Sequence, residues 1–101
     1  MTQTEMLRYR VPEITSDEEA NVLLETAKSA IMARRYPFED FPEELEIRYN
    51  DLQIRIAVEL FNKRGAEGET AHSENGISRS YSAAWISEEL LSEVTPKARV
   101  L

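Results

Sequence analysis

The sequence predicts a mainly all-α fold: a small helical bundle with two longer helices, a short C-terminal helix, a projecting loop or short β-hairpin, and extended termini. Three observations favour it. Apolar residues recur at helical spacing over two long stretches. Hydroxyl and acidic residues of the helix-capping type precede the helical stretches. The 101 residues, 42% of them hydrophobic, suit one domain with a modest core.

The first predicted helix follows an N-terminal arm. Residues 1–15 are expected to be irregular, because their apolar residues show no helical period and Pro12 bends the chain. Ser16 and the three acids after it form a capping-box pattern, which predicts a helix start. The helix should end at Tyr36, because the residue before Pro37 avoids helical angles. Its buried stripe is predicted to contain Ala20, Leu23, Leu24, Ala27, Ala30 and Ile31.

A second helix is predicted over residues 38–65. Asp40 or the residue after it can serve as the cap, Pro42 is tolerated in the first turn, and Gly65 suits the left-handed closing position. Together the two helices are expected to form a core over residues 16–64.

The second helix has apolar residues on two nearly opposite faces. One face contains Leu45, Tyr49, Leu52, Ile56 and Leu60, and the other contains Ile47, Ile54, Val58 and Phe61. A small domain has only one core, so another element must cover the second face. The cover is either another segment of the same chain or a neighbouring subunit. On the second interpretation Ile54, Val58 and Phe61 belong to a protein interface.

The rest of the chain is predicted to contain a loop, a short helix and a tail. Residues 65–84 are rich in glycine and polar side chains and should project as a loop, with a tight turn at Asn75-Gly76. Residues 85–95 should form a short helix capped by Ser87, and residues 96–101 an extended tail. Ile77, Arg79 and Tyr81 alternate as in a short strand. Arg64, Arg79, Tyr81 and Trp85 are of types that anchor interfaces, although the two aromatic rings, Trp85 above all, can instead complete the core.

No catalytic, cofactor or metal site is predicted. The chain has no cysteine, and its one histidine, His72, stands among loop carboxylates without further imidazole ligands. The nearby serines lack a general base that is itself held in place by a third residue, as activation of a serine nucleophile requires. A net charge of −7 argues against broad phosphate binding, and no apolar run reaches the roughly 20 residues that a membrane span needs.

The segments RGAEGETAHSENGISRSY and ISEELLSEVTPKARVL resemble the small head-tail connector proteins of tailed bacteriophages, also called adaptor, head-completion or DNA-packaging proteins. The resemblance is strongest from about residue 60 to residue 100. It implies a structural virion protein of the neck, assembled in the bacterial host cytoplasm. Such proteins form a ring, commonly dodecameric, on the portal, extend the DNA channel and support the downstream stopper protein.

The resemblance assigns no catalytic role and no cofactor. It implies that the loop contacts a neighbouring subunit or the portal, and that the C-terminal tail is a second docking segment. The residues expected in these interfaces are Arg64, Glu67, His72, Ser73, Glu74, Asn75, Ile77, Arg79, Tyr81, Lys97 and Val100. DNA would pass through the lumen without sequence-specific binding. A small acidic regulatory or antitoxin-like binding protein is the alternative that charge and helical pattern leave open.

Overall fold

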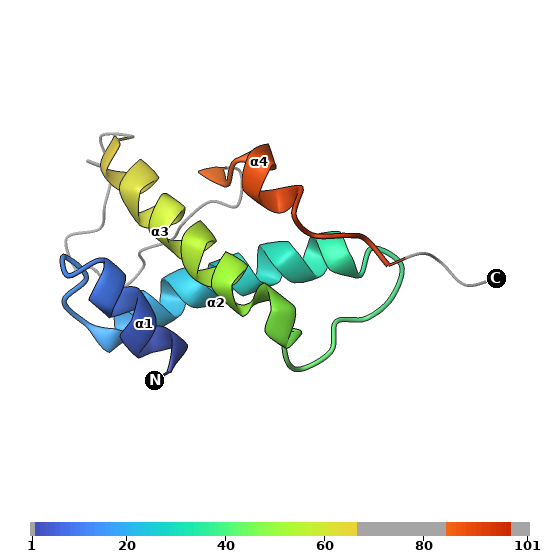
Figure 1. Cartoon of the computed structure of the whole chain (residues 1–101), viewed down its shortest axis with the longest axis horizontal. Coiled ribbons are helices and arrows are strands. Elements are labelled where there is room, and N and C mark those ends of the chain that lie inside the picture. Colours follow the sequence, from blue (N-terminus) through green and yellow to red (C-terminus); the bar gives the residue numbers. More distant parts are fainter. Residues whose placement is uncertain (1, 67–84, 98–101) are drawn as a thin grey trace.

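The computed structural model describes residues 2–66 and 85–97. These residues form a bundle of α-helices and contain no β-strand (Figure 1). The helices are α1 (Gln3–Arg10), α2 (Asp17–Arg35), α3 (Asn50–Ala66) and α4 (Glu88–Leu91), and a 3-10 turn, η1 (Ile47–Tyr49), leads into α3. The predicted mainly helical fold, with two longer helices and a short C-terminal one, is confirmed. The projecting loop or hairpin falls on residues 67–84, outside the described part.

The N-terminal segment is a helix, so the prediction of an irregular arm over residues 1–15 is wrong. Thr2 accepts a hydrogen bond from the Glu5 backbone, and the Glu5 side chain bonds back to the Thr2 backbone. This capping box starts α1, and the fully buried Leu7 anchors α1 in the core. The eight-residue helix is too short to show a clear apolar period, and for this reason the pattern did not reveal it.

Helix α2 agrees with its prediction at both ends. The Ser16 hydroxyl accepts a hydrogen bond from the Glu19 backbone, and the helix ends at Arg35 with Tyr36 as the closing residue. The predicted stripe is buried apart from Ala30, which is partly exposed, and Met32 joins it. Because α2 packs against α1, α3 and α4, this stripe organises the bundle.

Helix α3 begins much later than predicted. Residues 36–46, here called the α2–α3 connection, are not helical, and regular helix starts only at Asn50. Pro42 has no amide hydrogen to donate, and a proline disfavours helical angles at the residue before it. Lys28 also donates to the Glu43 carbonyl (2.8 Å), which draws the connection onto α2. At its other end α3 continues through the predicted stop at Gly65 to Ala66.

The bundle covers one apolar face of α3, and part of the other, from within the same chain. Tyr49, Leu52, Ile56 and Leu60 are buried on one face, as predicted, and Leu45 is partly buried. On the other face, Ile54 is 3% exposed and belongs to the same core. Ile47, seven residues earlier, is 83% exposed. Intrachain burial therefore holds for Ile54 but not for the whole face.

A buried glutamine joins three helices. The Gln53 side-chain amide of α3 donates to the Leu24 carbonyl of α2 at 2.9 Å. Its Oε1 accepts from the Gln3 side chain of α1 at 3.0 Å, and Gln3 also donates to the Asn50 carbonyl. Because these bonds satisfy both ends of the buried amide, Gln53 helps to fix how α1 lies on the α2–α3 pair.

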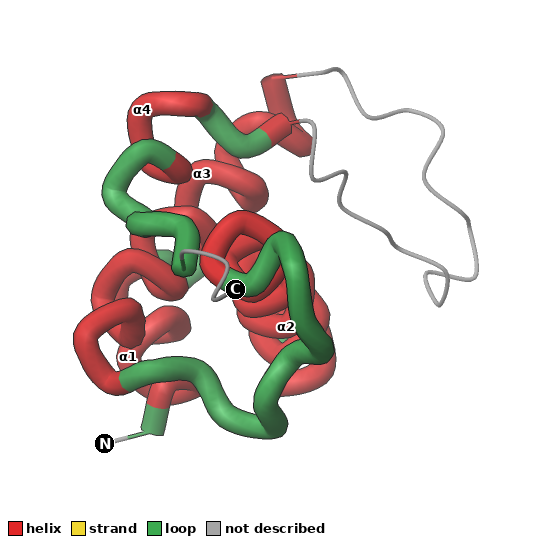
Figure 2. The backbone as a smooth tube through the Cα atoms, turned by 90° about the vertical axis from the view of Figure 1, so that its right-hand side faces the viewer, coloured by secondary structure: helices red, strands yellow, loops and turns green. Residues whose placement is uncertain are grey.

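The C-terminal segment lies against α2 and α3, at a different place from α1 (Figures 1 and 2). The Ser87 hydroxyl accepts from the Leu90 backbone and caps α4, as predicted. Ile86 and Val94 are buried on either side of α4, and Trp85 is partly buried against the core. The helix itself is shorter than the predicted residues 85–95, because turns replace its last part.

Candidate protein interface

The structure divides the predicted interface residues into three groups. Ile54 is in the core, whereas Val58 and Phe61 are partly buried and pack against it. Lys97 is exposed, and Arg64 lies in α3. The remaining members lie outside the described residues: Glu67, His72, Ser73, Glu74, Asn75, Ile77, Arg79, Tyr81 and Val100. Ile54 is thus corrected to a core residue, and an interface role for the others stays a prediction.

The tail up to Lys97 is fastened to the end of α2. Arg35 donates from Nη1 to the Thr95 carbonyl at 2.6 Å, and its own carbonyl accepts from the Lys97 backbone at 2.8 Å. The Arg35 guanidinium also pairs with both carboxylate oxygens of Glu46, at 2.8 and 3.3 Å. The Tyr49 hydroxyl accepts from the Thr95 backbone at 3.3 Å. One arginine therefore links α2, the α2–α3 connection and the tail.

Further charged contacts hold α4 and the turn after it. Arg55 of α3 forms a two-pronged ion pair with Glu93, at 2.7 and 2.8 Å, and also pairs with Asp51. Arg34 pairs with Glu88, and the Glu59 carboxylate accepts from the Ser87 backbone at 2.8 Å. The C-terminal segment is attached by charged contacts as well as by Ile86 and Val94.

The arginine contacts shift the acid–base equilibria of their partners. The hydrogen bond from Arg55 lowers the pKa of Glu93, and the hydrogen bond from Arg35 lowers the pKa of Glu46. In return, the hydrogen bond to Glu93 raises the pKa of Arg55. A carboxylate whose pKa is depressed by folding stabilises the fold above its ordinary pKa, and this contribution is lost as the pH falls through the folded value.

We therefore expect the C-terminal segment to loosen in acid before the α2–α3 core does. Between about pH 6 and about pH 3, amide-exchange protection at Thr95 and Lys97 should fall relative to that of core amides. Glu93→Gln should lower this protection at the upper pH and weaken its pH dependence. Glu89→Gln, a neighbouring exposed carboxylate, is the control. Equal pH profiles for the two variants would contradict the prediction.

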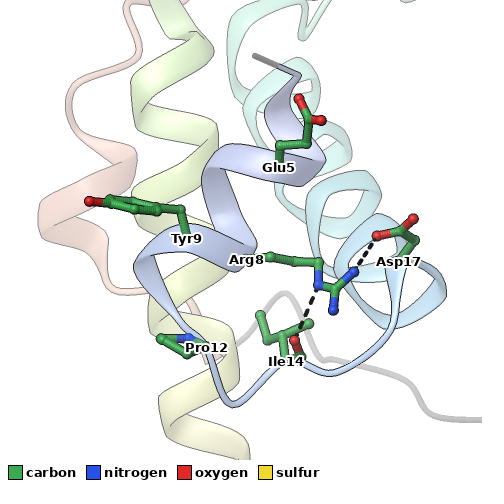
Figure 3. Close-up of a pocket in the computed structure, with 6 residues that line it drawn as sticks. All are labelled: Glu5, Arg8, Tyr9, Pro12, Ile14 and Asp17. Carbon is green, nitrogen blue, oxygen red and sulfur yellow. Dashed lines mark hydrogen bonds and ion pairs between the residues drawn. The ribbon is translucent and has the colours of Figure 1, made fainter.

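A shallow depression lies between α1 and the start of α2. It has a volume of about 760 Å³ and is lined by Glu5, Arg8, Tyr9, Pro12, Ile14 and Asp17. Figure 3 shows Arg8 reaching across it, with its guanidinium 2.7 Å from Asp17 and donating to the Ile14 carbonyl at 3.3 Å. The charge of Arg8 is thus already paired with Asp17, and this contact joins α1 to the start of α2.

The α2–α3 connection exposes large apolar side chains. Phe38 is 61% exposed and Phe41 is 51% exposed, and Ile47 follows at the entrance to α3. Figure 1 shows the connection looping out at the end of the molecule opposite α1. Lys97 lies on it, with Nζ 3.4 Å from a Glu39 carboxylate oxygen and 5.8 Å from the centre of the Tyr36 ring. Exposed aromatic rings grouped on one segment are typical of a protein interface.

Residues 10–92 match the model of a protein family described as phage gp6-like head-tail connector protein. The chain belongs to this family. The match confirms the family resemblance and extends from the end of α1 through α4, well beyond the C-terminal part that first suggested it. No curated protein and no solved structure matches the chain at a significant level. Membership supports a structural connector role in the phage particle, joining head and tail components.

Neither a metal-ligand cluster nor a membrane-spanning helix occurs in the described part of the connector. Among residues 2–63 and 85–97, no three His, Asp or Glu side chains gather as they would around a metal ion. None of its described helices has the length and hydropathy to cross a membrane. The His72 environment considered from the sequence lies outside this part.

Sequence reasoning missed the exposed rings of the connection. It placed residues 38–46 inside a helix and assigned no interface role to Phe38 or Phe41. Two prolines within an acidic, aromatic stretch were the available signal, because prolines favour an extended path and acids favour solvent. The interface prediction therefore omitted the exposed aromatic surface of the connector.

Proposed function

We propose that this chain forms a ring in the neck of the virion, expected to be dodecameric, docked on the portal protein. The ring extends the DNA exit channel and offers a platform for the downstream stopper or tail-completion protein. The observation that carries this proposal is the family match over residues 10–92. We further infer that the particle acquires the ring during assembly in the bacterial cytoplasm.

The charge of the molecule supports a channel role. The chain has a net charge of −7, and an acidic wall lets DNA pass without adhering to it. The elongated bundle, 49 × 30 × 23 Å in extent, presents its α1 and connection ends far apart. A subunit with two separated ends can contact different neighbours, which suits a closed ring between two other assemblies.

The proposal is tested by measuring assembly with the portal. Native mass measurement of the purified chain, the portal, and their mixture should show a complex that gains a fixed whole number of chains. Imaging of intact particles should place the same ring at the neck. An unrelated acidic helical domain of similar mass, mixed with the portal in the same way, is the control. A stable free dimer that ignores the portal, together with absence from the neck, would refute the proposal.

A free monomer would not refute it. Small interfaces often form only when a template holds the subunits at high effective concentration. The decisive measurements are therefore the mass of the complex in the mixture with the portal and the position of the chain in the particle.

A further inference from the structure

The α2–α3 connection presents its aromatic rings in a constrained way. Pro37 and Pro42 restrict the backbone on either side of Phe38 and Phe41. Lys28 holds the connection through the Glu43 carbonyl, and Lys97 holds it through Glu39. A segment fixed at several points loses less conformational entropy when it binds than a free loop does. The rings are thus displayed on a partly prearranged surface.

The same segment is strongly acidic. Residues 36–46 contain five carboxylates and no Lys or Arg. Glu46 is paired with Arg35, and Glu39 with Lys97. Asp40, Glu43 and Glu44 are exposed, and their carboxylates form no ion pair with the Lys and Arg side chains of residues 2–63 and 85–97. A complementary surface must therefore be basic as well as apolar.

The described surface of a second copy does not offer that complement. Every Lys and Arg among residues 2–63 and 85–97 already contacts an acid or a carbonyl oxygen of its own chain. To pair with the connection of a neighbour, such a cation would have to give up an existing contact. The connections of two copies also repel each other, because each contains five carboxylates and no Lys or Arg. DNA, which is an anion, is repelled by the same carboxylates.

We propose that the α2–α3 connection is a docking surface for a different virion protein that presents a basic groove with an apolar floor. Phe38 and Phe41 enter the groove, and Asp40, Glu43 and Glu44 face its cationic edges. The rings supply most of the affinity, whereas the carboxylates steer the encounter and set its orientation. The inference rests on the proposed function for placing the chain in the neck, where such a partner is adjacent.

Site-specific crosslinking in intact particles identifies the occupant of this surface. The photoreactive residue p-benzoyl-phenylalanine takes the place of Phe41 in the full chain, and purified virions are irradiated and analysed by mass spectrometry. The same residue in place of Tyr9, at the opposite end of the bundle and 78% exposed, is the matched control. We expect position 41 to crosslink to another polypeptide, within a segment that contains Lys or Arg beside apolar residues, and position 9 not to reach that segment.

Other crosslinking results overturn the proposal. A product with a second copy of this chain, a product with DNA, or no product at position 41 in virions that contain the chain would each do so while leaving the connector role intact. Absence of the chain from purified virions would instead overturn the proposed function, and this inference with it.

A pair of charge-reversal variants tests the electrostatic part. Changing Asp40→Lys, Glu43→Lys and Glu44→Lys together should reduce incorporation into virions by about tenfold or more. The control reverses three exposed acids elsewhere, Glu13→Lys, Glu18→Lys and Glu25→Lys, and changes the net charge equally. It should stay within about twofold of the parent chain. Circular dichroism checks that both variants remain helical, and equal losses in the two would overturn the proposal.

Discussion

Replacing Ile54 by aspartate is expected to unfold the bundle or nearly so, whereas the same change at Ile47 should leave it folded. The two isoleucines lie seven residues apart and occupy the same phase of the helical pattern, yet Ile54 is 3% exposed and Ile47 is 83% exposed. At Ile54 the substitution removes a core side chain and places a carboxylate in a buried, apolar site. At Ile47 the new carboxylate stays in solvent.

The expected sizes follow from these surroundings. Ile54→Asp should lower the free energy of unfolding by more than about 4 kcal/mol, out of a total of roughly 5–15 kcal/mol for a domain of this kind. Ile47→Asp should change it by about 0.5 kcal/mol or less. Thermal unfolding followed by circular dichroism should show a fall in Tm of about 15 °C or more only for the first variant. If Ile54→Asp folded normally and merely failed to assemble, Ile54 would belong to a subunit interface after all.

Replacing Leu7 by alanine is expected to destabilise the whole domain, because α1 is part of the core. Leu7 is fully buried, and α1 contacts both α2 and α3. Removing a buried leucine side chain and leaving a cavity typically costs about 2–5 kcal/mol. A flexible arm would instead tolerate the change without measurable loss.

The matched control for Leu7→Ala is Tyr9→Ala. Tyr9 lies two residues away on the same helix and is 78% exposed, so its truncation should change the free energy of unfolding by about 0.5 kcal/mol or less. Urea unfolding of both variants measures the difference. Equal stability of the two would show that α1 does not contribute to the cooperative core.

The second apolar face of α3 is not the main surface that this connector subunit leaves for contacts with other proteins. The sequence left open whether the chain itself or a neighbouring subunit covers the second apolar face of α3, and the chain buries Ile54 by itself. Interface area must then come from other surfaces. The α2–α3 connection exposes Phe38 and Phe41, and the fastened tail places Lys97 beside it. These two segments lie close together although they are far apart in the sequence.

The helices with strong local signals were predictable. Ser16 and Ser87 cap α2 and α4 as their residue types predict, because a cap depends only on a hydroxyl and the amides within one turn. The buried stripe of α2 was predictable because its period repeats over 19 residues. Helix α1 had a local signal as well, in Thr2 and Glu5, but too few turns for a period.

The start of α3 and the exposed rings could not be derived in the same way. The stretch before Asn50 has helical spacing at Leu45 and Tyr49, which favoured a helix over residues 38–65. Tertiary contacts decide otherwise: Lys28 and Arg35 of α2 hold residues of the connection in a non-helical path. The predicted loop interface lies outside the described residues and stays a prediction.

By itself the sequence determined the helical class, the caps of α2 and α4 and the family, since local spacing and long residue patterns are properties of a single chain. Only the tertiary structure decided that Ile54 is inside, that Ile47, Phe38 and Phe41 are outside, and that Arg35 fastens the tail. The physical reason is that the helical period of the sequence indicates which residues share a face, whereas burial depends on which distant segment packs over that face.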